Sequence, residues 1–254
     1  MAIEASPLSL DPHGAAALCL HRNPPITPAS FYRTRLPLLA VIGVLFAFFA
    51  IAAASASAWL LLHWDEPIQR WVESQRTDGL DTFFRQVSGL ASTRSIILLA
   101  PLLAVLAWPR CRAVAIAVAI AAIVRPLLEF TLKEVVGRDR PDFSRMVDGT
   151  GFSFPSGHVM AAVALWGLVP VVVGLYTRRR AIWWTSVVVS GVIIVFVAAS
   201  RVYLGVHWFS DAVAGLLLGS FFLLGVEAVL GSVHRRHGCG RDEPVTKADA
   251  SALS

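Results

Sequence analysis

The chain has 254 residues, of which 56% are hydrophobic and only 15% are charged, and its mean hydropathy is +0.65. Charged residues make up about a quarter of an ordinary soluble domain, so this composition excludes a disordered chain and most soluble folds. The net charge is +5, and almost all of the positive charge is carried by arginine. This balance favours a membrane surface or an anionic substrate. The sequence has no clustered stripe of basic and aromatic residues of the kind that would indicate nucleic-acid binding.

The two ends of the chain differ in composition from its middle. Residues 1–32 are rich in Pro, Ala and Ser, and residues 238–254 also have little to bury, so both are predicted to be flexible tails. Residues 33–237 are predicted to form one ordered membrane domain.

Six apolar stretches of this domain are predicted to cross the membrane, because a spanning helix needs about 20 apolar residues. They are Leu36–Leu62, Ser95–Trp108, Ala113–Leu132, Val159–Tyr176, Ala181–Ala199 and Ala212–Leu230. The second is short and is expected to borrow residues from Val87–Arg94. The predicted fold is therefore an all-α, polytopic bundle of six transmembrane helices.

The connection between the first two spans has a different pattern. In residues 63–94, charged residues alternate with aromatic ones such as Trp71, Phe83 and Phe84. This pattern predicts an amphipathic helical segment that lies in the membrane interface, with the aromatic side chains as anchors.

Arginine is concentrated in alternate connections, which predicts the orientation in the membrane. These arginines are Arg22, Arg33, Arg35, Arg110, Arg112, Arg178, Arg179, Arg180, Arg235 and Arg236. We therefore expect a protein of the plasma (inner) membrane with both termini in the cytoplasm and the other three connections on the outer, periplasmic side.

Three polar clusters border the predicted spans on that outer side. They are Lys133 to Pro141, Phe154 to His158, and Ser200 to Asp211. Polar groups beside apolar spans are costly and need a reason. Lys133, Arg140 and Arg201 bring three cations to one membrane face, which indicates a phosphate ligand. Taken alone, each of these cationic side chains could simply reach from a helix end to the membrane interface.

Two histidines in these clusters suit opposite tasks. His207 and Asp211 are four residues apart and can share a helix face, so Asp211 could orient His207 for attack on phosphorus, although such a spacing also suits an ordinary interfacial pair. Ser156 and Gly157 precede a predicted helix, whose exposed N–H groups favour an anion. His158 follows them and could give a proton to the leaving oxygen.

The spacing of these clusters resembles the three-part signature of the type 2 phosphatidic acid phosphatase superfamily. The matching residues are Lys133, Arg140-Pro141, Pro155-Ser156-Gly157-His158, Ser200-Arg201, His207 and Asp211. The resemblance implies metal-independent hydrolysis through a phosphohistidine, with His207 as nucleophile, Asp211 as its partner and His158 as general acid. It further implies that Lys133, Arg140, Ser156, Gly157, Arg201 and Ser200 hold the phosphate.

The resemblance leads to the expectation of a lipid phosphate phosphatase that works in the bilayer without a cofactor or an obligatory metal. Its substrate would be a polyprenyl diphosphate, phosphatidic acid or phosphatidylglycerol phosphate at the outer leaflet. Two alternatives remain open: a phosphotransferase with an acceptor other than water, and a non-catalytic lipid-phosphate binder or transporter. Arg125 and Glu129 lie within the third predicted span, where they could be a packing pair; alternatively, Arg125 could contact a lipid headgroup, or Glu129 could tune Lys133.

Overall fold

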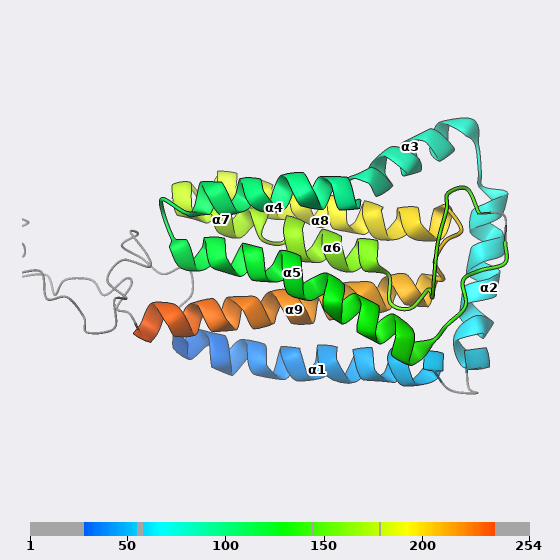
Figure 1. The fold of residues 1–254 in the computed structure, drawn as a ribbon, viewed down its shortest axis with the longest axis horizontal. Coiled ribbons are helices and arrows are strands. Elements are labelled where there is room, and N and C mark those ends of the chain that lie inside the picture. Colours follow the sequence, from blue (N-terminus) through cyan, green and yellow to red (C-terminus); the bar gives the residue numbers. More distant parts are fainter. Residues whose placement is uncertain (1–27, 55–57, 144, 178, 237–254) are drawn as a thin grey trace, which may run out of the picture.

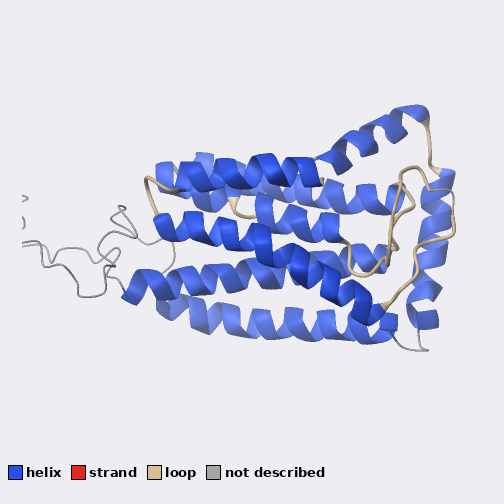
Figure 2. Ribbon diagram, in the orientation of Figure 1, coloured by secondary structure: helices blue, strands red, loops and turns tan. Residues whose placement is uncertain are grey.

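The computed structural model describes residues 28–54, 58–143, 145–177 and 179–236, and all regular structure in these ranges is helical (Figure 2). In chain order the helices are α1 (Pro28–Ala54), α2 (Ala58–Ser74), α3 (Asp78–Gly89), α4 (Thr93–Ala107), α5 (Arg112–Val136), α6 (Gly157–Trp166), α7 (Val169–Tyr176), α8 (Arg180–Tyr203) and α9 (Phe209–Arg236). The predicted all-α fold is confirmed.

Most of the helices run alongside one another in a bundle, and α2 lies across one end of it (Figure 1). We call this end the α2 end. The loop between α5 and α6 also lies there, whereas α1 begins and α9 ends at the opposite end. The connections between successive helices are short, except the one at residues 137–156.

Five helical stretches are long and apolar enough to cross a membrane. They are Pro37–Ala54, Arg112–Val136, Gly157–Tyr176, Arg180–Tyr203 and Phe209–Ala228. Helices α3 and α4 meet at 44° and form a sixth span if the bent pair is taken as one. The predicted multi-pass bundle is confirmed in this form, and its short second span is extended by α3.

The first predicted span is wrong at its end. Helix α1 stops at Ala54 and α2 begins at Ala58, so residues 58–62 belong to the helix across the bundle end. The apolar run continues from α1 into α2 because Leu61 is buried against α1, and run length alone does not reveal where one helix ends and the next begins. Helix α1 also begins at Pro28, inside the tail predicted for residues 1–32; residues 1–27 and the predicted tail 238–254 lie outside the described residues.

The predicted amphipathic segment is present as α2 and α3, but α2 buries polar side chains. Trp59, Trp64 and Trp71 are 67%, 66% and 65% exposed, whereas Asp65 and Gln69 are only 1% and 0% exposed. This is the reverse of a helix that packs an apolar stripe on a core. The polar groups of α2 therefore face the bundle, and its tryptophans face outward.

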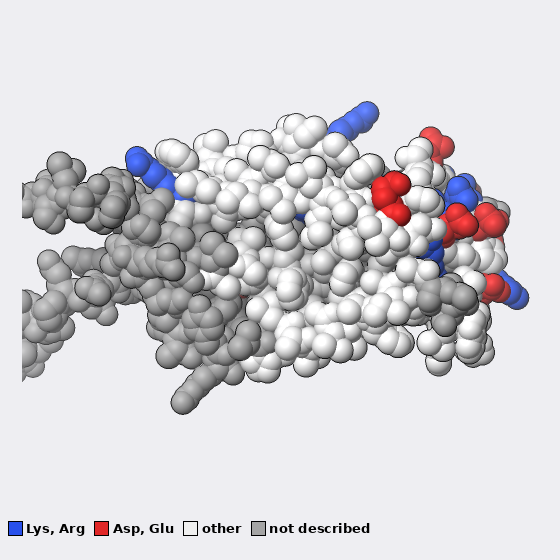
Figure 3. All heavy atoms as spheres, turned by 60° about the horizontal axis from the view of Figure 1, so that its bottom comes forward, with Lys and Arg blue, Asp and Glu red and all other residues white. Residues whose placement is uncertain are grey.

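The face drawn in Figure 3 has a wide region with few charges. In Figure 3 the acidic and basic side chains gather mainly at the α2 end, and few lie along the sides of the helices. Large apolar side chains such as Val44, Leu98 and Phe130 are more than 60% exposed on those sides. An apolar belt of this extent is typical of a membrane protein.

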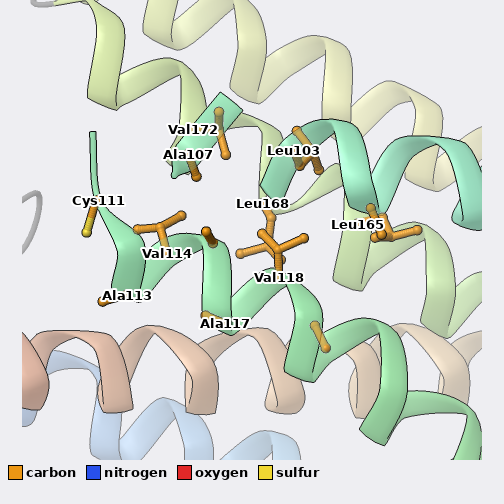
Figure 4. Close-up of a cluster of buried hydrophobic side chains, with 13 residues drawn as sticks. Leu103, Ala107, Cys111, Ala113, Val114, Ala117, Val118, Leu165, Leu168 and Val172 are labelled. Carbon is orange, nitrogen blue, oxygen red and sulfur yellow. The ribbon is translucent and has the colours of Figure 1, made fainter. Parts of the chain in front are cut away.

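The main hydrophobic core lies between α4, α5 and the α6–α7 region, toward the end opposite α2. Leu103, Val114, Val118, Leu165 and Leu168 point toward one another there (Figure 4). Many of their neighbours are alanines, and small residues let membrane helices approach closely. This core holds α4, α5 and α6 together without taking part in the site.

Helix α6 packs closely on α9 through glycines. A Cβ at Gly215 would lie 2.8 Å from the carbonyl oxygen of Ser156, and one at Gly219 would lie 2.8 Å from Cβ of Val163. These glycines are four residues apart and form a small-residue face on α9. The predicted span Val159–Tyr176 is broken after Trp166, because Pro170 has no N–H for the carbonyl of Trp166.

Candidate active site

Four helix ends meet at the α2 end and bring the three sequence clusters together: the end of α5, the start of α6, the end of α8 and the start of α9 (Figure 1). Helix α5 stops at Gly137, whose left-handed φ of 63° suits glycine and whose N–H donates to the Lys133 carbonyl at 2.9 Å. The chain then folds back over the bundle end, where Ser153 N donates to the Arg138 carbonyl at 2.7 Å.

His207 lies in the turn between α8 and α9, and its side chain is buried. Its Nδ1 is 3.7 Å from Oδ2 of Asp211, outside hydrogen-bonding distance, and has no hydrogen-bond partner among the described residues. Its Nε2 is 3.4 Å from Nη1 of Arg140. Because a guanidinium can only donate, we assign the ring proton to Nδ1, toward Asp211, and the lone pair to Nε2.

Burial lowers the pKa of His207 to about 4, because the protein interior disfavours the charged ring. The carboxylate of Asp211 acts in the opposite direction, and the charges of Arg201 and Arg140 add to the lowering. The ring is therefore neutral at pH 7. A neutral imidazole has the lone pair that a nucleophile needs.

Arg140 lies beside His207 and is held by the backbone. Burial lowers its pKa, and the attraction of Asp211 acts against this. Its Nε, Nη1 and Nη2 atoms donate at 2.6 to 3.2 Å to the carbonyl oxygens of Gly151, Val206, Thr150 and Phe152. With the His207 contact, these bonds occupy the donors of the guanidinium. Arg140 therefore fixes the 137–156 loop around the histidine, and must exchange a partner to hold a phosphate.

Arg201 and Lys133 are the two other cations predicted for the site. Arg201 is buried near the end of α8, where Nη1 donates to Oγ of Ser88 on α3, and its buried Nε has no partner among the residues described. Lys133 Nζ lies 2.9 Å from Oε1 of Glu129. Arg201 thus keeps an unused donor for a ligand, whereas Lys133 pairs with a carboxylate of its own helix.

The start of α6 carries Ser156 and Gly157. Ser156 N donates to the Asp211 carbonyl at 3.1 Å, which ties this turn to the start of α9. The buried Ser156 Oγ has no partner in the part of the chain that the structure describes. A Cβ at Gly157 would overlap the Glu129 carboxylate, so any larger residue here would displace that carboxylate.

His158 is half-buried in the first turn of α6. The charges of Arg201 and Lys133 and the ring of His207 all act on it electrostatically. The two predicted histidines and the three predicted cations therefore lie around one site. Ser200 is placed differently, because its Oγ donates to the Val197 carbonyl at 2.6 Å within α8.

Arg125 and Glu129 form part of the support beneath the site. Arg125 Nη1 donates to Glu129 Oε2 at 2.7 Å and to the Gly157 carbonyl at 3.3 Å. Glu129 thus carries ion pairs to both Arg125 and Lys133. This arrangement is a packing pair in which Glu129 also pairs with Lys133; the tuning of Lys133 stays a prediction.

Sequence reasoning missed two residues next to the predicted site, Arg138 and Asp65. Arg138 is buried and donates to Oδ1 of Asp211 at 2.6 Å and to Oδ2 of Asp65 at 2.8 Å. Arg138 lies inside the first cluster, and its position directly after the helix-ending Gly137 was a usable signal. No local pattern sets Asp65 apart from the other acidic residues of the 63–94 segment.

The donor set of the site is cationic. Within the described ranges, no group of three or more His, Cys, Asp or Glu side chains is placed to hold a metal ion. The arginine, lysine and histidine side chains instead suit an anion with several oxygen atoms, such as a phosphate.

A family model described as the PAP2 superfamily matches residues 110–233 of the chain. Phosphatidylglycerophosphatase B of Bacillus subtilis is 41% identical over 105 residues, which cover 39% of this chain and 50% of that protein. Undecaprenyl-diphosphatase of Sulfolobus acidocaldarius is 32% identical over 122 residues, with coverages of 46% and 55%. The chain thus spans about half the length of these two relatives.

A third relative is covered more fully. The Escherichia coli protein YbjG, whose name as an undecaprenyl-diphosphatase is provisional, is 31% identical over 151 residues, which cover 54% of this chain and 69% of that protein. Among solved structures, a transmembrane PAP2-type phosphatidylglycerolphosphate phosphatase from Bacillus subtilis is similar with a TM-score of 0.66 and 26% identity, over 75% of this chain and 94% of that one.

Proposed function

Because the chain belongs to the PAP2 superfamily, we propose that it is an integral membrane phosphatase that removes a phosphate group from a membrane lipid. The observation that carries this proposal is the position of the buried, neutral His207. Its Nε2 faces the Arg140 side of the site, and its Nδ1 faces Asp211. Such a ring can attack a phosphorus atom that cations hold in place.

In the first step, Nε2 of His207 attacks the phosphorus and the bond to the leaving oxygen breaks. The new N–P bond leaves positive charge on the ring, which the Asp211 carboxylate stabilises through Nδ1–H. The 3.7 Å separation shortens when the ring carries charge. His158 gives its proton to the leaving oxygen, so the lipid alcohol or lipid monophosphate departs neutral at that atom.

In the second step, water attacks the phosphohistidine. The His158 ring, which has lost its proton, takes one from this water, and the N–P bond breaks to release inorganic phosphate. Arg201 and Lys133 neutralise the oxygens of the transferring group, because phosphoryl transfer depends on positioning and charge more than on covalent help. These fixed cations perform the task of a metal ion, so activity needs no divalent metal.

The substrate class follows from the relatives and from the apolar belt. Two relatives carry the names phosphatidylglycerophosphatase and undecaprenyl-diphosphatase, which supports a phosphatidyl phosphate or a polyprenyl diphosphate as substrate. The cations recognise the phosphate, and the lipid-facing helices accept the tail. We place the site at the outer leaflet of the inner membrane, with both termini in the cytoplasm, from the distribution of arginine.

The test is phosphate release by the purified protein in detergent, with phosphatidic acid, phosphatidylglycerol phosphate and undecaprenyl diphosphate as substrates and no added acceptor. We expect release from at least one of them, undiminished by EDTA, and complete loss in His207→Ala. The control is His63→Ala, because His63 is exposed on α2 outside the site.

Each contrary result has its own meaning. A fully active His207→Ala protein contradicts the nucleophile, and loss of activity in EDTA contradicts the cation-only site. Phosphate that leaves the lipid only when a second alcohol is present identifies a transferase. Binding of all three lipids without turnover identifies a binding protein.

A further inference from the structure

A buried chain of charges leads from α2 to the proposed nucleophile. Asp65 Oδ2 accepts from Arg138 Nη2 at 2.8 Å, and Arg138 Nη1 donates to Asp211 Oδ1 at 2.6 Å. The side chains of Asp65, Arg138 and Asp211 are 0%, 5% and 0% exposed. Three charges are thus shielded from water at the point where α2, the loop after α5, and α9 meet.

Ser210 completes this chain. Its N–H and Oγ donate to Asp65 at 2.8 and 2.5 Å, and its Oγ also accepts from Arg138 Nη1 at 2.7 Å. Asp65 is therefore fixed to the first turn of α9, one residue before Asp211. Gln69, one turn further along α2, donates to the Val202 carbonyl at 3.3 Å and holds the same helix against α8.

The two oxygens of Asp211 are used by different partners. Arg138 takes Oδ1, while Oδ2 accepts from Trp208 N at 3.0 Å and is the oxygen that faces His207 Nδ1 at 3.7 Å. The carboxylate consequently has a fixed rotation. Without Arg138 it has no other charged partner on the Oδ1 side within the described part of the chain.

From this arrangement we propose that Asp65 and Arg138 are positioning residues for the phosphoryl transfer: Arg138 fixes the Asp211 carboxylate toward His207, and Asp65 compensates the charge of Arg138. This inference rests on the proposed function, because it assumes His207 as the nucleophile. It gives α2 a task in the reaction beyond lying across the bundle end.

The electrostatic reason is the balance of charge on the Nδ1 side of the ring. The formal charges of Asp65, Arg138 and Asp211 leave one net negative charge there. Attack by Nε2 makes the ring positive, and this net charge stabilises it. If Asp65 were neutral, Arg138 would cancel Asp211, and the developing charge on His207 would have no net counter-charge on that side.

Removing the Asp65 charge therefore has two expected effects. The rate of attack falls because the positively charged ring is less stable. The pKa of His207 also falls, so the ring stays neutral to lower pH and the acid limb of the kcat profile moves to lower pH. The other charged or titratable groups that act on His207 stay in place: Arg140 from the loop after α5, Arg201 from α8, Asp211 from α9 and His158 from α6.

The experiment uses Asp65→Asn and Arg138→Lys in the full chain, with a short-chain phosphatidic acid in detergent as substrate and inorganic phosphate as competing inhibitor. In both variants we expect kcat to fall about 10- to 100-fold, as for other partners that orient a reacting group. The inhibition constant for inorganic phosphate should stay within about twofold, because Arg201 and Lys133 are untouched. For Asp65→Asn, the acid limb of kcat should also move to lower pH.

Two controls match the changes in chemistry and location. Glu66→Gln removes the neighbouring carboxylate of α2, which pairs with Arg70 and has a side chain that is 41% exposed. Arg145→Lys changes an arginine of the same loop, which pairs with Asp142 and is 39% exposed. Both controls should keep the parent kcat and the parent acid limb. Thermal unfolding of every variant measures whether it is folded.

The inference is overturned if kcat of folded Asp65→Asn and Arg138→Lys stays within about twofold of the parent, or if phosphate inhibition weakens as much as kcat falls. An Asp65→Asn protein with reduced kcat and an unmoved acid limb also overturns it. Loss of the folded state in both variants overturns it too, because the chain of charges then serves stability and not the reaction. A failure of the proposed function is distinct: His207→Ala would remain active, whatever the Asp65 variants do.

Discussion

At the scale of single residues, burial keeps the ring of His207 neutral, and pairing with Arg138 fixes the carboxylate of Asp211. His207 is buried beside two arginines, which keeps its ring neutral, while Asp211 faces its Nδ1 from 3.7 Å. In the proposed mechanism, the same arginines that repel a proton from His207 attract phosphate oxygens. Burial and charge therefore favour a neutral nucleophile and an anionic ligand together.

His207 should remain neutral at pH 5, where an ordinary histidine with a pKa near 6.5 is mostly charged. The reason is its lowered pKa of about 4, so only a small share of the rings is protonated at pH 5. The measurement is a pH titration of histidine ring carbons by NMR in detergent, with His207→Ala used to assign the signal. A His207 signal that titrates near pH 6.5 would show that water reaches the ring.

At the scale of helices, the contact between α6 and α9 sets the distance between the two histidines. His158 is in the first turn of α6, and His207 precedes α9 by two residues. The close approach through Gly215 and Gly219 holds these helices together, and the bond from Ser156 N to the Asp211 carbonyl links their starts. Larger residues on this face of α9 would separate the two ring systems.

Gly219→Ala should destabilise the protein by about 1 to 3 kcal/mol, because the new methyl group overpacks the α6–α9 contact. Its Cβ would lie 2.8 Å from Cβ of Val163. Gly225→Ala is the matched control on the same helix, since a Cβ there meets nothing within 4 Å. Thermal unfolding in detergent compares the two variants. Equal stability would mean that α6 and α9 can move apart to accept the methyl group without a loss of folding free energy.

At the scale of the whole molecule, the bundle has one polar end and a wide apolar belt (Figure 3). Every residue proposed for catalysis lies at the α2 end, and α1 begins and α9 ends at the other (Figure 1). The proposed site therefore lies at one end of the apolar belt. Which side this is follows, in our proposal, from the arginines of the opposite connections.

The outward orientation predicts opposite labelling at the two ends. Asp142→Cys is at the α2 end, where the side chain is fully exposed, and Arg110→Cys is in the exposed α4–α5 connection. With Cys19 and Cys239 replaced by Ser, a membrane-impermeant maleimide should label Asp142→Cys in intact spheroplasts and Arg110→Cys only after permeabilisation. The reverse pattern would place the site in the cytoplasm.

Much of the site could be predicted from the sequence because its information is local. The polar residues predicted for the site stand at fixed spacings beside apolar runs: Lys133, Arg140, His158, Arg201, His207 and Asp211. Residues at such spacings on a helix lie on the same face, so their proximity can be predicted. The apolar runs also determined an all-helical membrane protein, because backbone groups in lipid must be satisfied within each segment.

Only the tertiary structure decided which distant residues meet. Asp65 and Arg138 are 73 residues apart, and their pairing depends on how α2 turns back over the bundle end. The tight fit of Gly157 against Glu129 likewise depends on the rotation of α5 against α6. Hydropathy measures the length of a helix but neither its rotation nor its neighbours, so the charges that support Asp211 became visible only when the helices were packed.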